Sequence, residues 1–180
     1  EVVLVVPPGT DVSRLVASIT LNTEATIAVI STGQRVVQRN GITPNNFASP
    51  VTYAIELPGE DEPVLYTVRV REASTNARLI DLSIGSSTSM MPTFGPTVAD
   101  YEAEVPYATE TVEVTARAED PRAFAISVNG RRAGGGQATA AVPFSQGDFV
   151  EIVVEVVAED KESRQEYRVL VLRGEPDSNN

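Results

Sequence analysis

The segment Tyr66-Thr67-Val68-Arg69-Val70-Arg71 carries an aromatic or apolar side chain at every second position. A period of two places these side chains on one face of a β-strand. The pattern returns 101 residues later as Tyr167-Arg168-Val169-Leu170-Val171. This stretch therefore predicts both a strand and an internal repeat.

Strand-like alternation extends over much of the chain. Its β-branched residues favour strands because their stiff side chains pack well on a pleated face. Turn signals such as Thr32-Gly33 and Asn129-Gly130 separate the strands. We expect one helical turn, at 10–15, capped by Thr10 or Asp11. The other alternating runs lie at 2–6, 27–29, 51–57, 112–116, 124–128 and 152–156. The sequence predicts an all-β fold of short antiparallel strands.

The repeat divides the chain into two domains. A shift of 99 residues aligns Val6-Pro7 with Val105-Pro106, and a shift of 101 aligns the later strands. A period of about 100 residues suits sandwich domains in tandem. We predict β-sandwiches at 1–72 and 78–173, a linker at 73–77 and a polar tail at 174–180.

The second domain opens with a segment that has no counterpart in the first. Residues 79–84 and 91–96 would have their equivalents before Glu1. Either the first strand of domain 1 is dispensable or lies upstream, or its absence leaves a sheet edge that another strand can pair with. We expect a monomer, with strand exchange between chains as the alternative.

The composition excludes several classes of function. The 180 residues include no Cys and no His, so disulfides, thiolate zinc sites, cysteine nucleophiles and Ser-His-Asp triads are ruled out. The net charge of −11 disfavours nucleic acid, because lysine and arginine drive phosphate binding. No apolar run approaches the ~20 residues of a membrane-spanning helix, so we expect no membrane insertion. We expect no enzyme activity and assign no catalytic, cofactor-binding or metal-binding residue.

Several motifs of the second half occur together in one known family. They are Leu79-x-Asp81-Leu82-Ser83-Ile84, Tyr101-x-Ala103-x-Val105-Pro106, Val128-Asn129-Gly130 and Tyr167-x-Val169-x-Val171. With these motifs, residues 78–173 resemble the bacterial cadherin-like β-sandwich domain, an immunoglobulin-like sandwich. Through Pro7-Pro8-Gly9-Thr10-Asp11 and Pro50-Val51-x-Tyr53, residues 1–72 resemble a related surface-protein repeat that lacks its first strand.

The resemblance implies a non-catalytic spacer or adhesion module of an exported bacterial protein, located outside the cell, on its surface or in the periplasm. The alternative is a module that binds a glycan or a protein through loops at a sandwich end. Arg131 and Arg132, beside Gly134-Gly135-Gly136, are the loop residues we would test first.

Two further groups of residues allow a functional or a structural interpretation. The acidic clusters Glu60-Asp61-Glu62, Glu119-Asp120 and Glu159-Asp160 have the oxygen ligands that calcium prefers, but we expect solvated turns and no cofactor. Tyr66 and Tyr167 share a strand face with valines. We therefore expect both rings in the core, with each hydroxyl bonded to backbone as in a tyrosine corner.

Overall fold

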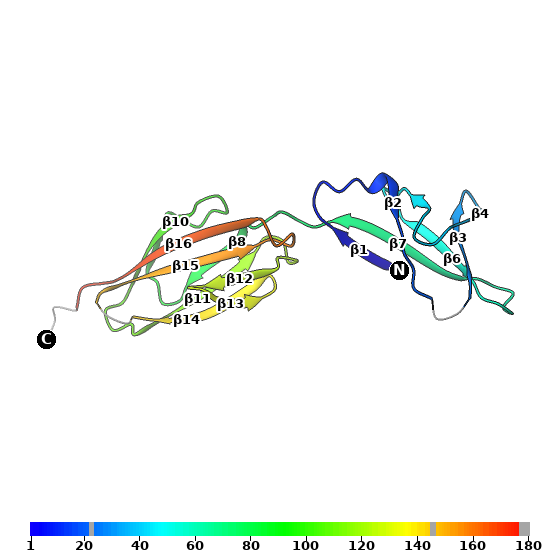
Figure 1. Ribbon diagram of the computed structural model, residues 1–180. Coiled ribbons are helices and arrows are strands. Elements are labelled where there is room, and N and C mark those ends of the chain that lie inside the picture. Colours follow the sequence, from blue (N-terminus) through cyan, green and yellow to red (C-terminus); the bar gives the residue numbers. More distant parts are fainter. Residues whose placement is uncertain (22–23, 145–146, 177–180) are drawn as a thin grey trace. The chain divides into compact units, whose positions relative to one another are not determined.

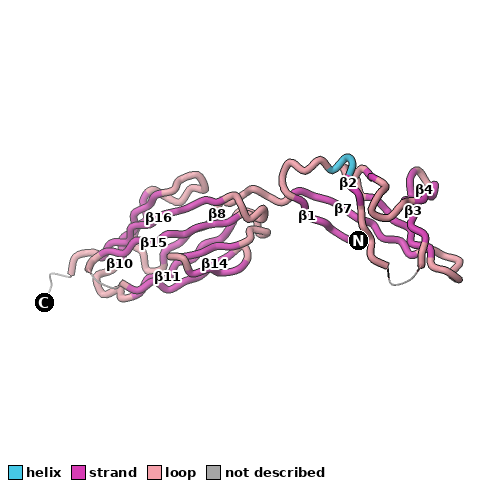
Figure 2. The backbone as a smooth tube through the Cα atoms, viewed as in Figure 1, coloured by secondary structure: helices cyan, strands magenta, loops and turns pink. Residues whose placement is uncertain are grey.

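The computed structural model describes residues 1–21, 24–144 and 147–176. Its contacts divide the chain into two compact units, unit 1 at Glu1–Ala73 and unit 2 at Ser74–Asn180 (Figure 1). Among the described residues, every regular element is a strand except one short 3-10 turn, η1 (Figure 2). The predicted all-β fold is confirmed. No helix in the described part of the chain has the length and apolar character to cross a bilayer.

Unit 1 contains one five-stranded sheet with the order β1-β7-β6-β3-β4, and a small two-stranded sheet, β2-β5. The helical turn predicted at 10–15 is η1, and Asp11 caps it by accepting a hydrogen bond from the Ser13 amide at 2.9 Å. The elements are β1 (Val2–Val6), η1 (Val12–Arg14), β2 (Leu15–Val16), β3 (Thr26–Ser31), β4 (Gln34–Val37), β5 (Pro44–Asn45), β6 (Val51–Glu56) and β7 (Val64–Glu72).

Unit 2 contains a six-stranded sheet, β13-β12-β15-β16-β10-β9, and a three-stranded sheet, β14-β11-β8. Its strands are β8 (Leu79–Ile84), β9 (Ser89–Met91), β10 (Asp100–Val105), β11 (Thr111–Ala118), β12 (Ala125–Val128), β13 (Arg131–Gly134), β14 (Gln137–Pro143), β15 (Phe149–Val157) and β16 (Arg164–Arg173). Alternate residues of both sheets enter one continuous core, so unit 2 is a closed sandwich.

The pairing registers confirm the internal repeat. Val2 pairs with Val68 in unit 1, and their equivalents under the shifts of 99 and 101 residues, Tyr101 and Val169, pair in unit 2. Tyr53 pairs with Tyr66 in the same way as Val154 pairs with Tyr167. The strand order β1-β7-β6-β3-β4 of unit 1 thus matches the order β10-β16-β15-β12-β13 in unit 2.

Each unit contains a parallel pair that we did not predict. The β1–β7 and β10–β16 pairs are parallel, whereas every other strand pair among the described residues is antiparallel. Alternation along one strand reports which side chains share a face, but it does not report the direction of the neighbouring strand. The predicted antiparallel sandwich architecture is therefore confirmed, with these two parallel pairs as exceptions that the sequence did not indicate.

The cores of the two units differ in extent. Unit 1 buries Ile27, Val29, Phe47, Val51, Tyr53 and Ile55, and residues from 12–21 pack over them. The core of unit 2 includes side chains from β8, β10, β11, β12, β14, β15 and β16. The smaller core of unit 1 leaves part of its sheet uncovered.

Candidate binding surfaces

Two of the acidic clusters, Glu119-Asp120 and Glu159-Asp160, accept hydrogen bonds from side chains and backbone amides of unit 2 itself. Asp120 is nearly fully buried and forms a bidentate pair with Arg122, with Nε–Oδ1 and Nη2–Oδ2 distances of 3.0 and 2.9 Å. Hydrogen bonding from Arg122 lowers the pKa of Asp120 far below its ordinary value, although burial opposes this shift. The Asp120 carboxylate is therefore used in holding this loop together.

Residues that we had placed in the linker are tied to the same cluster. The Ser74 amide donates to Oε2 of Glu159 at 3.1 Å, and the Asp160 amide donates to the Ser74 carbonyl at 3.1 Å. Asn76 Nδ2 donates to Oε2 of Glu119 at 3.0 Å. These bonds fix the start of unit 2 to its own loops.

Asp160 closes the turn before β16. Its Oδ1 accepts hydrogen bonds from the amides of Glu162 and Ser163, and its Oδ2 accepts one from the Ser163 hydroxyl. These bonds lower the pKa of Asp160, the bond from the Ser163 side chain most of all. Within the described ranges, no group of three acidic side chains is placed to hold a metal ion. The expectation that the chain has no cofactor stays a prediction.

Arg131 and Arg132, which we expected in a loop, lie in strand β13, and Arg132 packs on an aromatic ring. The Arg132 guanidinium lies 4.1 Å from the centroid of the Phe124 ring, and Nζ of Lys161 lies 5.0 Å from it. Arg131 is exposed. Phe124 and Arg132 also line a small concavity of about 230 Å³, together with Glu155 and Arg164.

The two repeat tyrosines differ from each other. Tyr167 is fully buried as predicted, and its hydroxyl accepts from the Leu79 amide and donates to the Pro96 carbonyl, both at 2.9 Å. Burial raises the pKa of Tyr167. Tyr66 is 48% exposed, so the prediction of a core position for Tyr66 was wrong. Its ring is on the expected face of the sheet, but that face is open there.

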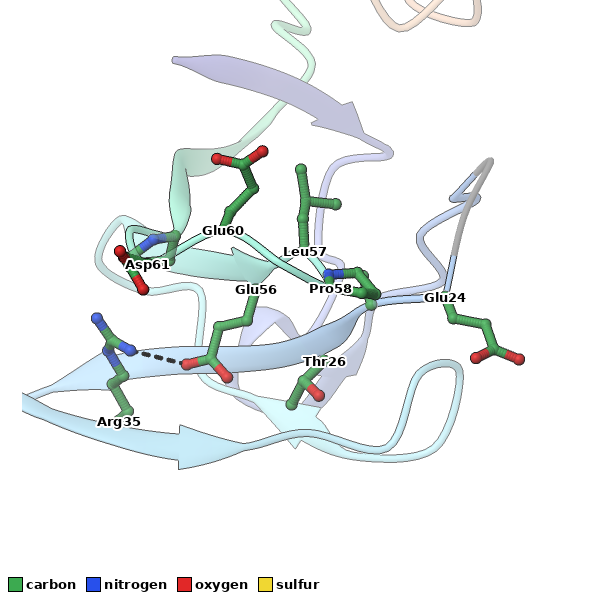
Figure 3. Close-up of a pocket in the computed structure, with 10 residues that line it drawn as sticks. Glu24, Thr26, Arg35, Glu56, Leu57, Pro58, Glu60 and Asp61 are labelled. Atoms are coloured by element: carbon green, nitrogen blue, oxygen red, sulfur yellow. Dashed lines mark hydrogen bonds and ion pairs between the residues drawn. The ribbon is translucent and has the colours of Figure 1, made fainter.

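A polar pocket of about 530 Å³ lies at one end of unit 1 (Figure 3). Arg35 of β4 and Glu56 of β6 face each other across it, with Nη1 and Oε1 2.9 Å apart. Figure 3 shows Glu60 and Asp61 on the turn after β6, and Glu24 pointing away from the Arg35–Glu56 pair. The pocket offers several hydrogen-bonding groups and a net negative charge. No aromatic ring lines it.

A second concavity of about 650 Å³, which we call the apolar groove, lies over the open part of the unit 1 sheet. Its floor includes Val2, Leu4 and Tyr66, and one wall is the segment 16–21. An unpaired sheet edge in this domain was one of two alternatives that the sequence left open, and alternation alone did not predict the groove. The full lining is Val2, Leu4, Val16, Ala17, Ser18, Ile19, Thr20, Leu21, Phe47, Tyr53, Ile55, Leu57, Val64, Tyr66 and Val68.

Comparison with protein families gives two matches. The model described as "Cadherin-like beta sandwich domain" matches residues 79–174, and the model described as "SGBP, N-terminal", from surface glycan-binding proteins, matches residues 1–70. Both are families of non-enzymatic modules. The search of individual curated proteins gives no match.

Proposed function

This chain belongs to the cadherin-like β-sandwich family, and on that premise we propose that it is a spacer and adhesion segment of an exported bacterial cell-surface protein. Its two units form a cell-surface module. In our proposal, unit 2 gives length and stiffness, and unit 1 carries the surfaces that recognise other molecules.

The closed core of unit 2 carries this proposal. Its core side chains come from both sheets, and among the described residues no buried side-chain polar atom lacks a hydrogen-bond partner. A sandwich that is dry inside and fully hydrogen bonded resists local opening. Those properties suit a spacer that must keep its length.

Force spectroscopy on the full chain, pulled from both ends, tests the spacer role. The two units differ in length, with extended chains of about 250 Å for unit 1 and about 360 Å for unit 2 at ~3.4 Å per residue, so unfolding of unit 2 gives the longer release. Units in series carry the same force, so the weaker unit opens first. We expect the longer release to come last. Unfolding of unit 2 before unit 1 would contradict the proposal.

Glycan binding by the polar pocket of unit 1 is the second candidate. It is favoured by the match of residues 1–70 to a family of surface glycan-binding proteins, and by the hydrogen-bonding groups around Arg35 and Glu56. A carboxylate and a guanidinium can bind sugar hydroxyls through charge-assisted hydrogen bonds.

An oligosaccharide array probed with the full chain tests this candidate. If the pocket is the site, Arg35→Ala and Glu56→Gln each weaken a positive signal about tenfold or more, since each removes a hydrogen bond to a charged group. Arg131→Ala is the matched control and leaves the signal unchanged. A signal that is lost with Arg131→Ala would instead indicate a site on unit 2. If no oligosaccharide binds, glycan binding is rejected and the spacer role is the remaining candidate.

A further inference from the structure

The apolar groove of unit 1 corresponds to a position that a strand occupies in unit 2. Under the shift of 99 residues, Leu15 of β2 aligns with Val114 of β11. In unit 2, β11 lies between β14 and β8, and Val114 pairs with Ile84 of β8. In the described part of unit 1, β2 pairs with β5 alone. The edge of β2 that is unpaired is therefore the one to which β8 is added in unit 2.

The exposure of equivalent residues shows what this strand covers. In unit 2, β8 buries Leu79, Leu82 and Ile84, and Leu79 is bonded to the Tyr167 hydroxyl. Tyr167, Tyr101 and Ala103 are 0%, 5% and 1% exposed, whereas their equivalents in unit 1, Tyr66, Val2 and Leu4, are 48%, 40% and 49% exposed. In unit 2 the Phe94 ring also lies 5.9 Å from the Tyr101 ring and 6.2 Å from the Tyr167 ring, so the floor of the groove has the exposure expected when both β8 and the segment after it are absent.

The segment 16–21, which forms the wall of the groove, is extended like a strand and is hydrogen bonded along one of its two edges. Exposure alternates along 15–21. The Ala17 carbonyl accepts from the Gly41 amide at 3.0 Å, and Ile19 exchanges hydrogen bonds with the Asn40 side chain at 2.8 and 2.6 Å. In an extended segment, residues two apart direct their amides and carbonyls to the same edge. Val16 and Ser18 therefore direct theirs to the opposite edge, along the groove.

The chemistry of the groove favours a peptide strand over a sugar. None of the described residues that line it is charged or carries an amide side chain, although 22% of the chain is charged. The polar side chains of this groove are the hydroxyls of Ser18, Thr20, Tyr53 and Tyr66, among a majority of apolar side chains, so it offers none of the charged groups that line the polar pocket. A β-strand instead needs an apolar floor for alternate side chains and an open backbone edge, as in recognition by strand addition.

We propose that the apolar groove binds an extended polypeptide strand from outside residues 1–180, added antiparallel to β2. Its inward side chains are apolar and spaced as Leu79, Leu82 and Ile84 are in β8. The strand covers Val2, Leu4 and Tyr66 and completes the second sheet of unit 1.

The test supplies such a strand to the full chain. Because Asp100 aligns with Glu1, a second copy of residues 79–99 is fused directly before Glu1. The matched control carries Leu82→Asp and Ile84→Asp in the added copy only. Unit 2 keeps its own β8 in both proteins. The readouts are fluorescence of a dye that binds exposed apolar surface, and hydrogen exchange of the amides at Val16 and Ser18.

We expect the added strand to lower dye fluorescence about threefold. We also expect it to slow exchange at Val16 and Ser18 about tenfold or more, because these amides become hydrogen bonded. The control protein should behave like the unextended chain. Equal behaviour of the two extended proteins would overturn the proposal. So would sedimentation of the unextended chain as a dimer with Val16 and Ser18 already protected, because a second copy would then fill the groove.

Discussion

Tyr66 and Tyr167 show how one residue type at equivalent positions takes different roles. The Tyr167 hydroxyl bridges the Leu79 amide and the Pro96 carbonyl, whereas Tyr66 borders the apolar groove. Tyr167→Phe leaves a buried amide without its acceptor, which costs about 1–3 kcal/mol of unfolding free energy. Tyr66→Phe, the matched control, should cost less than about 0.5 kcal/mol. Urea unfolding of both variants measures the difference, and equal losses would contradict the assigned roles.

The ion pair of Asp120 with Arg122 should make the stability of unit 2 depend on pH. The folded-state pKa of Asp120 is lowered, mainly by Arg122, from an ordinary value of 3.8. A lowered pKa contributes stability above the unfolded-state value, and that contribution is lost as the pH falls towards the folded-state value. Asp120→Asn should therefore destabilise unit 2 by about 1–2 kcal/mol at pH 7, since Arg122 is half exposed and solvent screens the pair.

The difference between Asp120→Asn and the original chain should shrink as the pH falls below about 4. Urea titrations from pH 7 to pH 2.5 follow it. Asp148→Asn, at an exposed position, is the control and should have little effect at any pH. A penalty for Asp120→Asn that stays constant over this range would show that Arg122 does not stabilise the carboxylate.

At the scale of elements, the tight turns were predictable because their chemistry is local. Asn129 and Gly130 both have positive φ, 47° and 75°, as a type I′ hairpin requires. The Asn129 side chain also accepts from the Val153 amide at 2.7 Å, which ties the turn to β15. The partners of each strand were less predictable, because pairing depends on residues far away in the chain. The parallel β1–β7 and β10–β16 pairs are the example.

Gly130 and Gly134, in the same hairpin, allow the effect of backbone conformation to be measured apart from the effect of packing. A Cβ at Gly130 or at Gly134 would meet no atom within 4 Å, but only Gly130 has positive φ. Gly130→Ala should lower the unfolding free energy of unit 2 by about 1 kcal/mol because of this backbone conformation. Gly134→Ala should be neutral or slightly stabilising. Thermal unfolding of the two variants gives the comparison, and equal effects would argue against the I′ turn.

At the scale of the whole molecule, the repeat was readable because both units keep the same registers under fixed shifts. The binding surfaces were not readable from the sequence. Alternation places Val2 and Leu4 on the inner face of β1 and Tyr66 on the inner face of β7. These side chains are exposed because no strand among the described residues covers them. The polar pocket likewise joins Arg35 to Glu56, which are distant in sequence and adjacent in the fold.

Residue-resolved amide hydrogen exchange on the full chain tests the contrast between a closed unit 2 and a partly open unit 1. Core strands exchange by global unfolding, whereas uncovered segments exchange by local opening. We predict strong protection at Tyr167, Val169 and Val171, and protection at least about a hundredfold weaker at Val16 and Ser18. Similar protection at both sets of amides, or rapid exchange throughout β16, would contradict the account.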